Sequence, residues 1–231
     1  MWRTDGQGKN FKTRPMFTRY KVTPLIEPPS KGGLWHLGKC REMTQISSLS
    51  VFCGSKTGAD PAHEAAARRL GELMVERDVR LIFGGGRIGL MGVVAKAVLD
   101  GGGHATGVIP GFLKELEVGD DGVTEQIVTG SMHERKSRMF ELSDGFVVLP
   151  GGLGTLDETL EIVTWKQLRL HSKPVVVVNT GGYWSALKDL VQNTIEGGFA
   201  HPAVAELFTV VDGPDDVFPA LEAAPEPKEE V

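Results

Sequence analysis

Short apolar runs that alternate with helical patterns from Leu49 onward constrain the fold of this 231-residue chain more than any other feature. The strand-like runs cover residues 49–55, 79–83, 104–110, 125–129, 145–150, 173–179 and 207–211. The helical patterns between them cover residues 61–78, 89–102, 131–144, 155–170 and 182–198. Near-continuous apolar strands separated by helices predict a parallel sheet covered on both faces. Because crossovers are right-handed, we expect an α/β fold: a single domain with a doubly wound, mostly parallel, Rossmann-like sheet.

Both ends of the chain depart from this alternation. Residues 1–45 hold nine Lys and Arg against three Asp and Glu, with Pro-Pro-Ser and Gly-Gly breakers and no sustained periodicity. This segment is basic like a transit peptide but almost lacks serine, so we interpret it as an irregular, adventitious extension. We therefore predict a Rossmann-like domain over residues 46–222, followed by a disordered tail over residues 223–231.

The composition excludes several classes of protein. A net charge of −5 and a pI near 5.7 argue against binding to nucleic acid or to an anionic membrane. Two cysteines, Cys40 and Cys53, do not make a disulfide framework, and no apolar run approaches the roughly 20 residues of a spanning helix. The histidines show no metal-ligand spacing, so we predict no metal site. We expect a cytoplasmic protein.

Three glycine-bearing loops follow predicted strands, at residues 53–58, 84–92 and 150–155. Ligands of doubly wound folds bind at the carboxyl ends of the strands, where these loops should meet. Residues 84–89, GGGRIG, match G-x-G-x-x-G, but the carboxylate that holds the ribose of NAD about 20 residues further on is missing. We therefore predict a phosphate- or mononucleotide-binding loop and reject NAD. The alternative is that these glycines only allow close packing of a helix on a strand.

The stretch LPGGLGTLDETLE, residues 149–161, joins a strand to a helix through three glycines. Bare backbone and a helix N-terminus can bind an anion, and such a terminus also favours an ionised carboxylate, so we expect Glu158 to be charged. The simpler interpretation is a tight turn, with Thr155 and Glu158 forming a T-x-x-E capping box. We expect Glu158 to serve both as a cap and in catalysis.

Basic side chains cluster in MHERKSRM, residues 132–139, which follows the preceding predicted strand. They are His133, Arg135, Lys136 and Arg138. Their place at the carboxyl end of a strand favours an anion site at the same sheet edge over a solvated helix face.

Together, GGGRIGLMG, MHERK and PGGLGTLDE, with GVIP and TWKQLRLHSKPVVVVN, resemble the Lonely guy (LOG) family over about residues 49–211. Its members are cytokinin riboside 5′-monophosphate phosphoribohydrolases, long labelled possible lysine decarboxylases. The resemblance implies hydrolysis of the N-glycosidic bond of an adenine-type nucleoside 5′-monophosphate to free base and ribose 5-phosphate. It also implies a homodimer that needs no cofactor.

By position, the resemblance places the family's catalytic residues on Arg135 and Glu158. Substrate binding is assigned to Ser55, Gly84, Gly85, Gly86, Glu117, Met132, Lys136, Gly151, Gly152, Leu153, Gly154, Thr155, Leu156, Asp157 and Thr164. Ser137 is a mild departure from the family motif. A carboxylate can stabilise the positive charge that develops on a ribose, and an arginine can hold a phosphate in a bidentate contact.

Two other functions stay open at the level of sequence. One is a non-catalytic nucleotide-binding or carrier protein, which would gain nothing from a carboxylate at Glu158. The other is an amino-acid decarboxylase, which would need pyridoxal phosphate on a lysine in a cofactor pocket. Whether the preferred base is adenine or an isopentenyl-type derivative is also left open.

Overall fold

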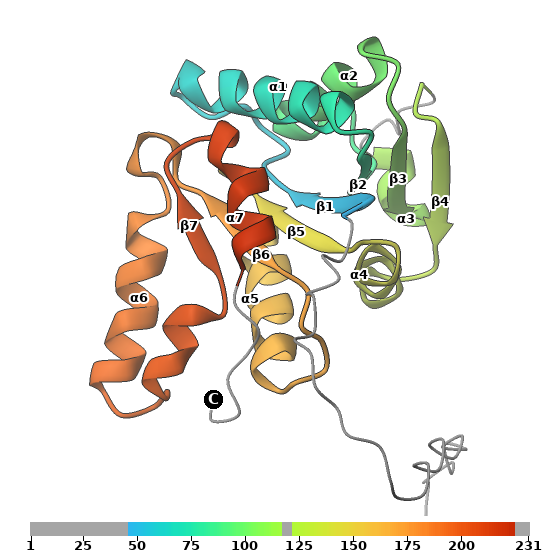
Figure 1. The fold of residues 1–231 in the computed structure, drawn as a ribbon. Helices are drawn as coiled ribbons and strands as arrows, with labels where there is room; N and C mark the ends of the chain where they lie inside the picture. Colours follow the sequence, from blue (N-terminus) through green and yellow to red (C-terminus); the bar gives the residue numbers. More distant parts are fainter. Residues whose placement is uncertain (1–45, 117–121, 225–231) are drawn as a thin grey trace, which may run out of the picture. The chain divides into compact units, whose positions relative to one another are not determined.

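A computed structural model describes residues 46–116 and 122–224 (Figure 1). The chain divides into two units between Glu42 and Met43, and every described residue belongs to the second unit. Glu117 and the two predicted chain ends, apart from residues 223 and 224, lie outside the described residues.

The described core is a seven-stranded sheet in which every pair of neighbouring strands is parallel. The strands are β1 (Ser48–Phe52), β2 (Arg80–Phe83), β3 (Ala105–Pro110), β4 (Glu125–Thr129), β5 (Gly145–Val148), β6 (Val175–Val178) and β7 (Thr209–Val211). Their order is β4-β3-β2-β1-β5-β6-β7, so the direction of winding reverses between β1 and β5. The doubly wound, parallel sheet predicted from the alternating pattern is confirmed.

Helices cover both faces of this sheet (Figure 1). The α-helices are α1 (Pro61–Glu76), α2 (Gly89–Asp100), α3 (Gly111–Leu116), α4 (Met132–Glu141), α5 (Leu153–Gln167), α6 (Ser185–Glu196) and α7 (Val217–Ala223). Short 3-10 turns cover Thr180–Gly182, Pro202–Glu206 and Pro214–Asp216. The sequence pattern missed α3, α7 and these turns, because elements of three to seven residues hold too little periodicity to stand out.

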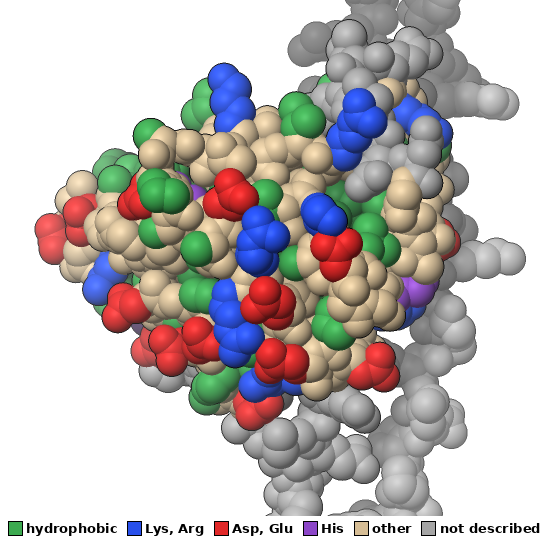
Figure 2. Space-filling model, turned by 90° about the horizontal axis from the view of Figure 1, so that it is seen from above, with side chains coloured by type: hydrophobic (Ala, Val, Ile, Leu, Met, Phe, Trp, Pro, Cys, Tyr) green, Lys and Arg blue, Asp and Glu red, His purple; other side chains and the backbone are tan. Residues whose placement is uncertain are grey.

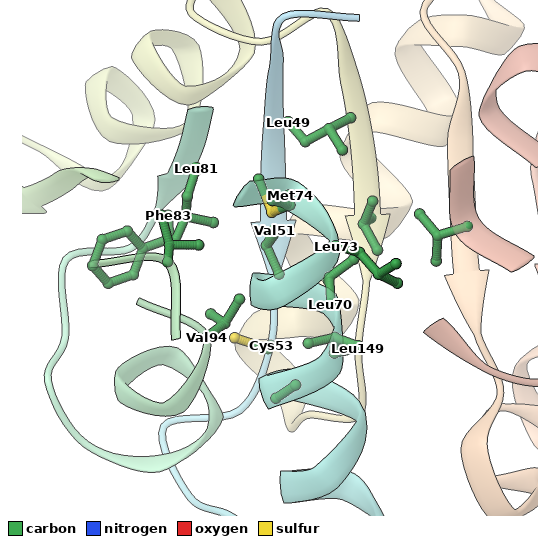
Figure 3. Packing of buried hydrophobic residues seen from close by; sticks show 14 of the residues in the cluster. Leu49, Val51, Cys53, Leu70, Leu73, Met74, Leu81, Phe83, Val94 and Leu149 are labelled. Atoms are coloured by element: carbon green, nitrogen blue, oxygen red, sulfur yellow. The ribbon is translucent and has the colours of Figure 1, made fainter. Parts of the chain in front are cut away.

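Two apolar clusters form the core, one on each face of the sheet. On the first face, α1, α2 and α7 pack against alternate residues of the central strands, among them Leu49, Val51 and Leu81 (Figure 3). On the second face, α4, α5 and α6 pack against the residues between those, such as Phe52 and Ile82. Because successive strand residues point to opposite faces, strands buried on both sides are apolar throughout, as the sequence pattern required.

Charged side chains are mixed over the surface. On the face drawn in Figure 2, Lys and Arg side chains lie among Asp and Glu side chains and do not gather in a patch of their own. No helix among residues 46–116 and 122–224 is long and apolar enough to cross a membrane.

Asp144, just before β5, ties the start of β5 to the start of β1. One carboxylate oxygen accepts hydrogen bonds from the backbone N–H and the hydroxyl of both Ser47 and Ser48, at 2.8–3.0 Å. Burial by itself raises the pKa of Asp144, but these four bonds outweigh it and hold the pKa below the usual aspartate value. The ionised carboxylate therefore stabilises the pairing of the two central strands.

We predict that Asp144→Ala lowers the free energy of unfolding by about 1–2 kcal/mol at pH 7, the value for charged hydrogen bonds reduced by partial solvation. Since folding lowers this pKa, the contribution is present above about pH 3.9 and is lost as the pH falls through the folded pKa. Urea denaturation at pH 7 and at low pH measures it. Asp100→Ala, which breaks an exposed pair with Lys96, is the control and should cost under about 0.5 kcal/mol. Equal losses in the two variants would contradict the prediction.

Candidate active site

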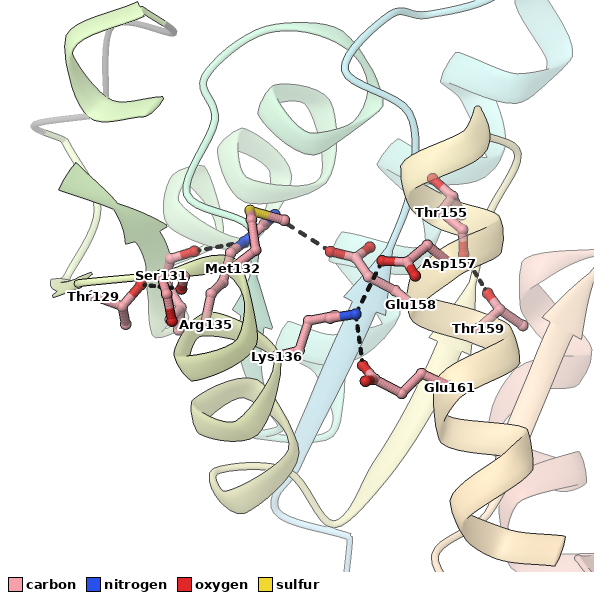
Figure 4. Close-up of polar contacts among 11 residues, drawn as sticks. Thr129, Ser131, Met132, Arg135, Lys136, Thr155, Asp157, Glu158, Thr159 and Glu161 are labelled. Carbon is pink, nitrogen blue, oxygen red and sulfur yellow. Dashed lines mark hydrogen bonds and ion pairs between the residues drawn. The ribbon is translucent and has the colours of Figure 1, made fainter. Parts of the chain in front are cut away.

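Arg135 lies in α4 and is directed across the carboxyl ends of the strands. The Ser131 hydroxyl accepts a hydrogen bond from the Glu134 N–H at 3.1 Å, which fixes the start of α4. The Arg135 side chain is buried, 9% exposed, and its Nε donates to the carbonyl oxygen of Val108 in β3 at 3.1 Å. Its Nη2 lies 3.4 Å from Oε1 of Glu158 in α5 (Figure 4). The two predicted catalytic side chains thus form a buried ion pair.

Gly84, at the end of β2, provides the space for this guanidinium. A Cβ atom at Gly84 would overlap Nη2 of Arg135. The next glycine, Gly85, has a φ of 76° and packs against Gly107 of β3. These contacts agree with the alternative interpretation of GGGRIG as a packing motif, and a role of this loop in binding phosphate stays a prediction.

Glu158 is 8% exposed, and burial raises its pKa above the usual glutamate value. The charge of Arg135 opposes that rise. From the sequence we expected the helix N-terminus to keep this carboxylate charged. The helix terminus does not have that effect here, because α5 begins at Leu153 and Glu158 lies beyond its first turn. The nearby guanidinium, and not the helix terminus, is what favours the charged form.

The predicted capping box is also wrong. The N-cap of α5 is Gly152, with no side-chain cap, and Thr155 lies inside the helix. Thr155 is buried, and its carbonyl oxygen accepts a hydrogen bond from the Thr159 hydroxyl at 2.6 Å. The N-cap lies three residues before the one that the Thr-x-x-Glu pattern suggested, so Leu153, Gly154 and Thr155 are already part of the helix. Glu158 therefore does not cap α5, and its side chain pairs with Arg135 instead.

Lys136, next to Arg135, contacts α5 at a different point. Its Nζ lies 3.0 Å from Oδ2 of Asp157 and 2.9 Å from Oε2 of Glu161 (Figure 4). Burial lowers the pKa of Lys136, but these two carboxylates outweigh burial and raise it. The basic cluster predicted from MHERKSRM is divided between these environments, since Arg138 pairs with Glu141 on the exposed side of α4. A phosphate would have to share Lys136 with the two acids.

A cavity of about 370 Å³ opens where the sheet changes its direction of winding, between the loops that follow β1 and β5. Its lining residues are Gly54, Ser55, Lys56, Thr57, Gly58, His63, Leu90, Pro150, Gly151, Gly152 and Tyr183. Two of the three predicted glycine loops therefore meet here, as expected for ligand sites of this fold. Cys53, which precedes Gly54, is buried, and burial raises the pKa of its thiol, with a further rise from Glu158 and an opposing effect of Arg135. Cys53 is thus within electrostatic range of both charges of the ion pair, and the residue after it lines the cavity.

Of the eleven lining residues, the sequence predicted Ser55, Gly151 and Gly152 as site residues. Lys56, His63 and Tyr183 are among those that it did not predict. Lys56 lies inside the glycine loop of residues 53–58, so its position in that loop could have identified it as a cavity residue. His63 and Tyr183 come from α1 and from the turn before α6, and only the tertiary fold brings them to the loop.

Several predicted residues lie away from this cavity. Arg135, Glu158, Gly84, Gly85, Gly86 and Met132 do not line it, although the Met132 sulfur lies 3.9 Å from Nη1 of Arg135. Thr164 is exposed on α5 and lies on a different side of that helix from Glu158, rotated by about 120° around the helix axis. Leu153 and Gly154 are exposed at the start of α5, and Leu156 is half-buried. Among the residues that the structure describes, no three His, Cys, Asp or Glu side chains could hold a metal ion together.

This fold and site define a doubly wound α/β protein with a loop cavity at its switch point and a buried Arg–Glu pair. The family model described as "Possible lysine decarboxylase" matches residues 91–221. A probable cytokinin riboside 5′-monophosphate phosphoribohydrolase of Oryza sativa subsp. japonica is 48% identical over 205 residues, 86% of this chain and 89% of that protein. A cytokinin riboside 5′-monophosphate phosphoribohydrolase of Arabidopsis thaliana is 42% identical over 170 residues, 74% and 79% of the two chains. The chain belongs to this family, the LOG family of possible lysine decarboxylases.

Solved structures with the same fold are more distant in sequence. The molybdenum cofactor carrier protein of Chlamydomonas reinhardtii matches with a TM-score of 0.59 at 23% identity, covering 76% of this chain and 95% of that one. The molybdenum cofactor binding protein of Rippkaea orientalis matches with a TM-score of 0.57 at 21% identity, with the same coverage. At such identities the likeness concerns the fold alone.

Proposed function

We propose that this protein hydrolyses the N-glycosidic bond of adenine-type nucleoside 5′-monophosphates and releases free base and ribose 5-phosphate. Cytokinin riboside 5′-monophosphates and AMP are the substrates in question, since the relatives are named for the former. The observation that carries the proposal is the buried Arg135–Glu158 pair, which forms at the same sheet that carries a loop cavity at its switch point.

The pair suits the charge that this reaction creates. As the bond from the base to ribose C1′ breaks, the electron pair leaves with the base and positive charge spreads over C1′ and the ring oxygen. A carboxylate in a dry site stabilises that charge strongly and can orient the water that attacks C1′. Burial raises the pKa of Glu158, and the charge of Arg135 opposes that rise and so favours the ionised form. The base takes up a proton, and the water oxygen remains on C1′.

The cavity suits the 5′-phosphate. Gly151 and Gly152 lead into α5, whose N-terminal N–H groups and dipole favour an anion. Ser55, Lys56 and Thr57 add two hydroxyl groups and an ammonium from the opposite loop. In this proposal residues 152–158 and Lys136 bind the nucleotide, and Glu117 also contacts it.

The carrier alternative is less well supported by this site. A protein that only holds an anion loses affinity from a carboxylate nearby, whereas a hydrolase of ribosyl bonds needs one. The acidic composition and the two cysteines fit a cytoplasmic enzyme, and that location is part of the proposal.

We also propose that the enzyme is a homodimer that pairs through α5. Leu153, Leu160 and Leu168 are 85%, 42% and 63% exposed and repeat on one face of this helix, which also carries Thr164. Thr164 faces away from Glu158 of its own chain, so a substrate contact requires a second copy.

Light scattering should give twice the chain mass of 24.9 kDa. Leu160→Glu should yield monomers with reduced turnover, whereas the matched control Leu190→Glu on α6 should stay dimeric. A monomeric wild type that turns over substrate would contradict the dimer.

We predict that Glu158→Gln lowers kcat by two or more orders of magnitude, because the charge is needed in the transition state. The amide keeps the size of the side chain and an oxygen that can accept from Arg135, but it removes the counter-charge of a buried guanidinium, so the melting temperature should fall while the variant stays folded at the assay temperature. Release of free base from AMP, followed by chromatography, gives kcat. Near-normal turnover by this variant would remove Glu158 from the mechanism.

We further predict that the 5′-phosphate is obligatory. Binding energy gained at the phosphate positions the reacting bond, so adenosine should lose kcat as well as affinity relative to AMP. A hydrogen bond to a charged group contributes about 1.5–3 kcal/mol, so the loss of several lowers kcat/KM by at least about a thousandfold. Paired assays with AMP and adenosine, and with the isopentenyl derivatives of both, test this. Comparable kcat/KM values with and without the phosphate would refute the proposed function.

A further inference from the structure

The Tyr183 hydroxyl donates a hydrogen bond of 2.6 Å to the carbonyl oxygen of Gly151. Both residues line the loop cavity, but they come from different parts of the chain, since Tyr183 follows the turn after β6. No motif in the sequence points to this tyrosine. The bond connects the β6–α6 turn to the glycine loop that leads into α5.

The ring of Tyr183 is held in place independently of its hydroxyl. It meets the ring of His63 edge-on, with centroids 5.2 Å apart, and the ring of Trp184 with centroids 4.9 Å apart. The backbone N–H of Trp184 donates a hydrogen bond to Oδ1 of Asn179 at 2.6 Å, which fixes the backbone at this turn. A phenylalanine at position 183 would therefore occupy the same space and lack only the hydroxyl.

Gly151 is enclosed on its other sides. A Cβ atom at Gly151 would overlap Oγ1 of Thr155 and would lie 2.9 Å from the backbone nitrogen of Gly54. Gly54 in turn donates to the carbonyl oxygen of Pro150 at 3.0 Å. These contacts fix the position of the Gly151 Cα atom but not the rotation of the peptide group between Gly151 and Gly152. Because glycines have few steric restrictions, that peptide group can rotate at low cost unless it is bonded.

The bond from Tyr183 fixes this rotation. In a trans peptide group the carbonyl and the following N–H point in opposite directions, so anchoring the Gly151 oxygen also sets the direction of the Gly152 N–H. If the group turned over, a carbonyl oxygen would take the place of that N–H and would repel an anion.

We propose that Tyr183 is a positioning residue for the phosphate group, acting through the peptide group between Gly151 and Gly152. This inference rests on the proposed function for the identity of the anion. In a variant that lacks the Tyr183 hydroxyl the substrate still carries its phosphate, which still positions the reacting bond once it is bound. The effect therefore falls mainly on KM and changes kcat little, unlike the complete loss of the phosphate in adenosine.

The test is Tyr183→Phe in the full-length protein, with ribose 5-phosphate as the probe. Calorimetry should show roughly tenfold weaker binding of ribose 5-phosphate than in the wild type, the effect of losing about one hydrogen bond. The KM for AMP should rise by a similar factor, with kcat within about twofold and an unchanged melting temperature. Thr194→Val is the control, since it removes a hydroxyl that donates to a backbone carbonyl, that of Val191, within α6. The control should bind ribose 5-phosphate like the wild type.

Three results would overturn the inference: equal binding of ribose 5-phosphate by Tyr183→Phe and wild type, an equal loss in Thr194→Val, or a fall in kcat with KM unchanged. No binding of ribose 5-phosphate by the wild type would overturn it as well. The proposed function fails on a different measurement, the absence of free base from wild-type enzyme and monophosphate. A protein that binds ribose 5-phosphate through Tyr183 but cleaves nothing would thus refute the hydrolase and support the role of Tyr183.

Discussion

The burial of an arginine and a glutamate side by side is the constraint around which the rest of this site is arranged. Removing two charges from water is costly, and the cost is offset only when both partners are well bonded. Arg135 meets that condition through Glu158 and the Val108 carbonyl oxygen, and it reaches both because Gly84 leaves room for its guanidinium. The pair can therefore form only when the folded chain has brought α4 and α5 together at the carboxyl ends of β2 and β3.

The glycine loops in this part of the molecule have two different roles, close packing and lining a cavity, which look alike in sequence. Gly84 and Gly85 allow close approach of side chain and backbone, which holds the ion pair together. Gly54, Gly151 and Gly152 instead line the cavity at the switch point, where bare backbone is open to the cavity. Packing and binding make the same demand on a residue, the absence of a Cβ atom. A glycine motif alone therefore cannot reveal which task it serves.

The sequence predicted what depends on local pattern and missed what depends on tertiary contact. The parallel sheet followed from apolar strands buried on both faces, and the motifs around Arg135 and Glu158 placed both residues at one sheet edge. The start of α5 was misplaced because Thr155 looks like a cap, whereas its burial inside the helix is decided by packing against Gly151. Tyr183 was missed because an isolated tyrosine after a glycine turn has no distinguishing pattern.

The ionisation of Glu158 could not be predicted from sequence for the same reason, and it determines how substrate and catalyst interact. Burial favours the neutral acid, and a phosphate dianion arriving nearby would favour it further, since like charges raise the pKa of a carboxyl. Arg135 is the largest opposing influence, while Lys136, which also lowers this pKa, is shared with Asp157 and Glu161. A site that binds an anion next to a catalytic carboxylate must therefore keep a positive charge against that carboxylate before the anion enters. The ion pair in this structure already provides that charge.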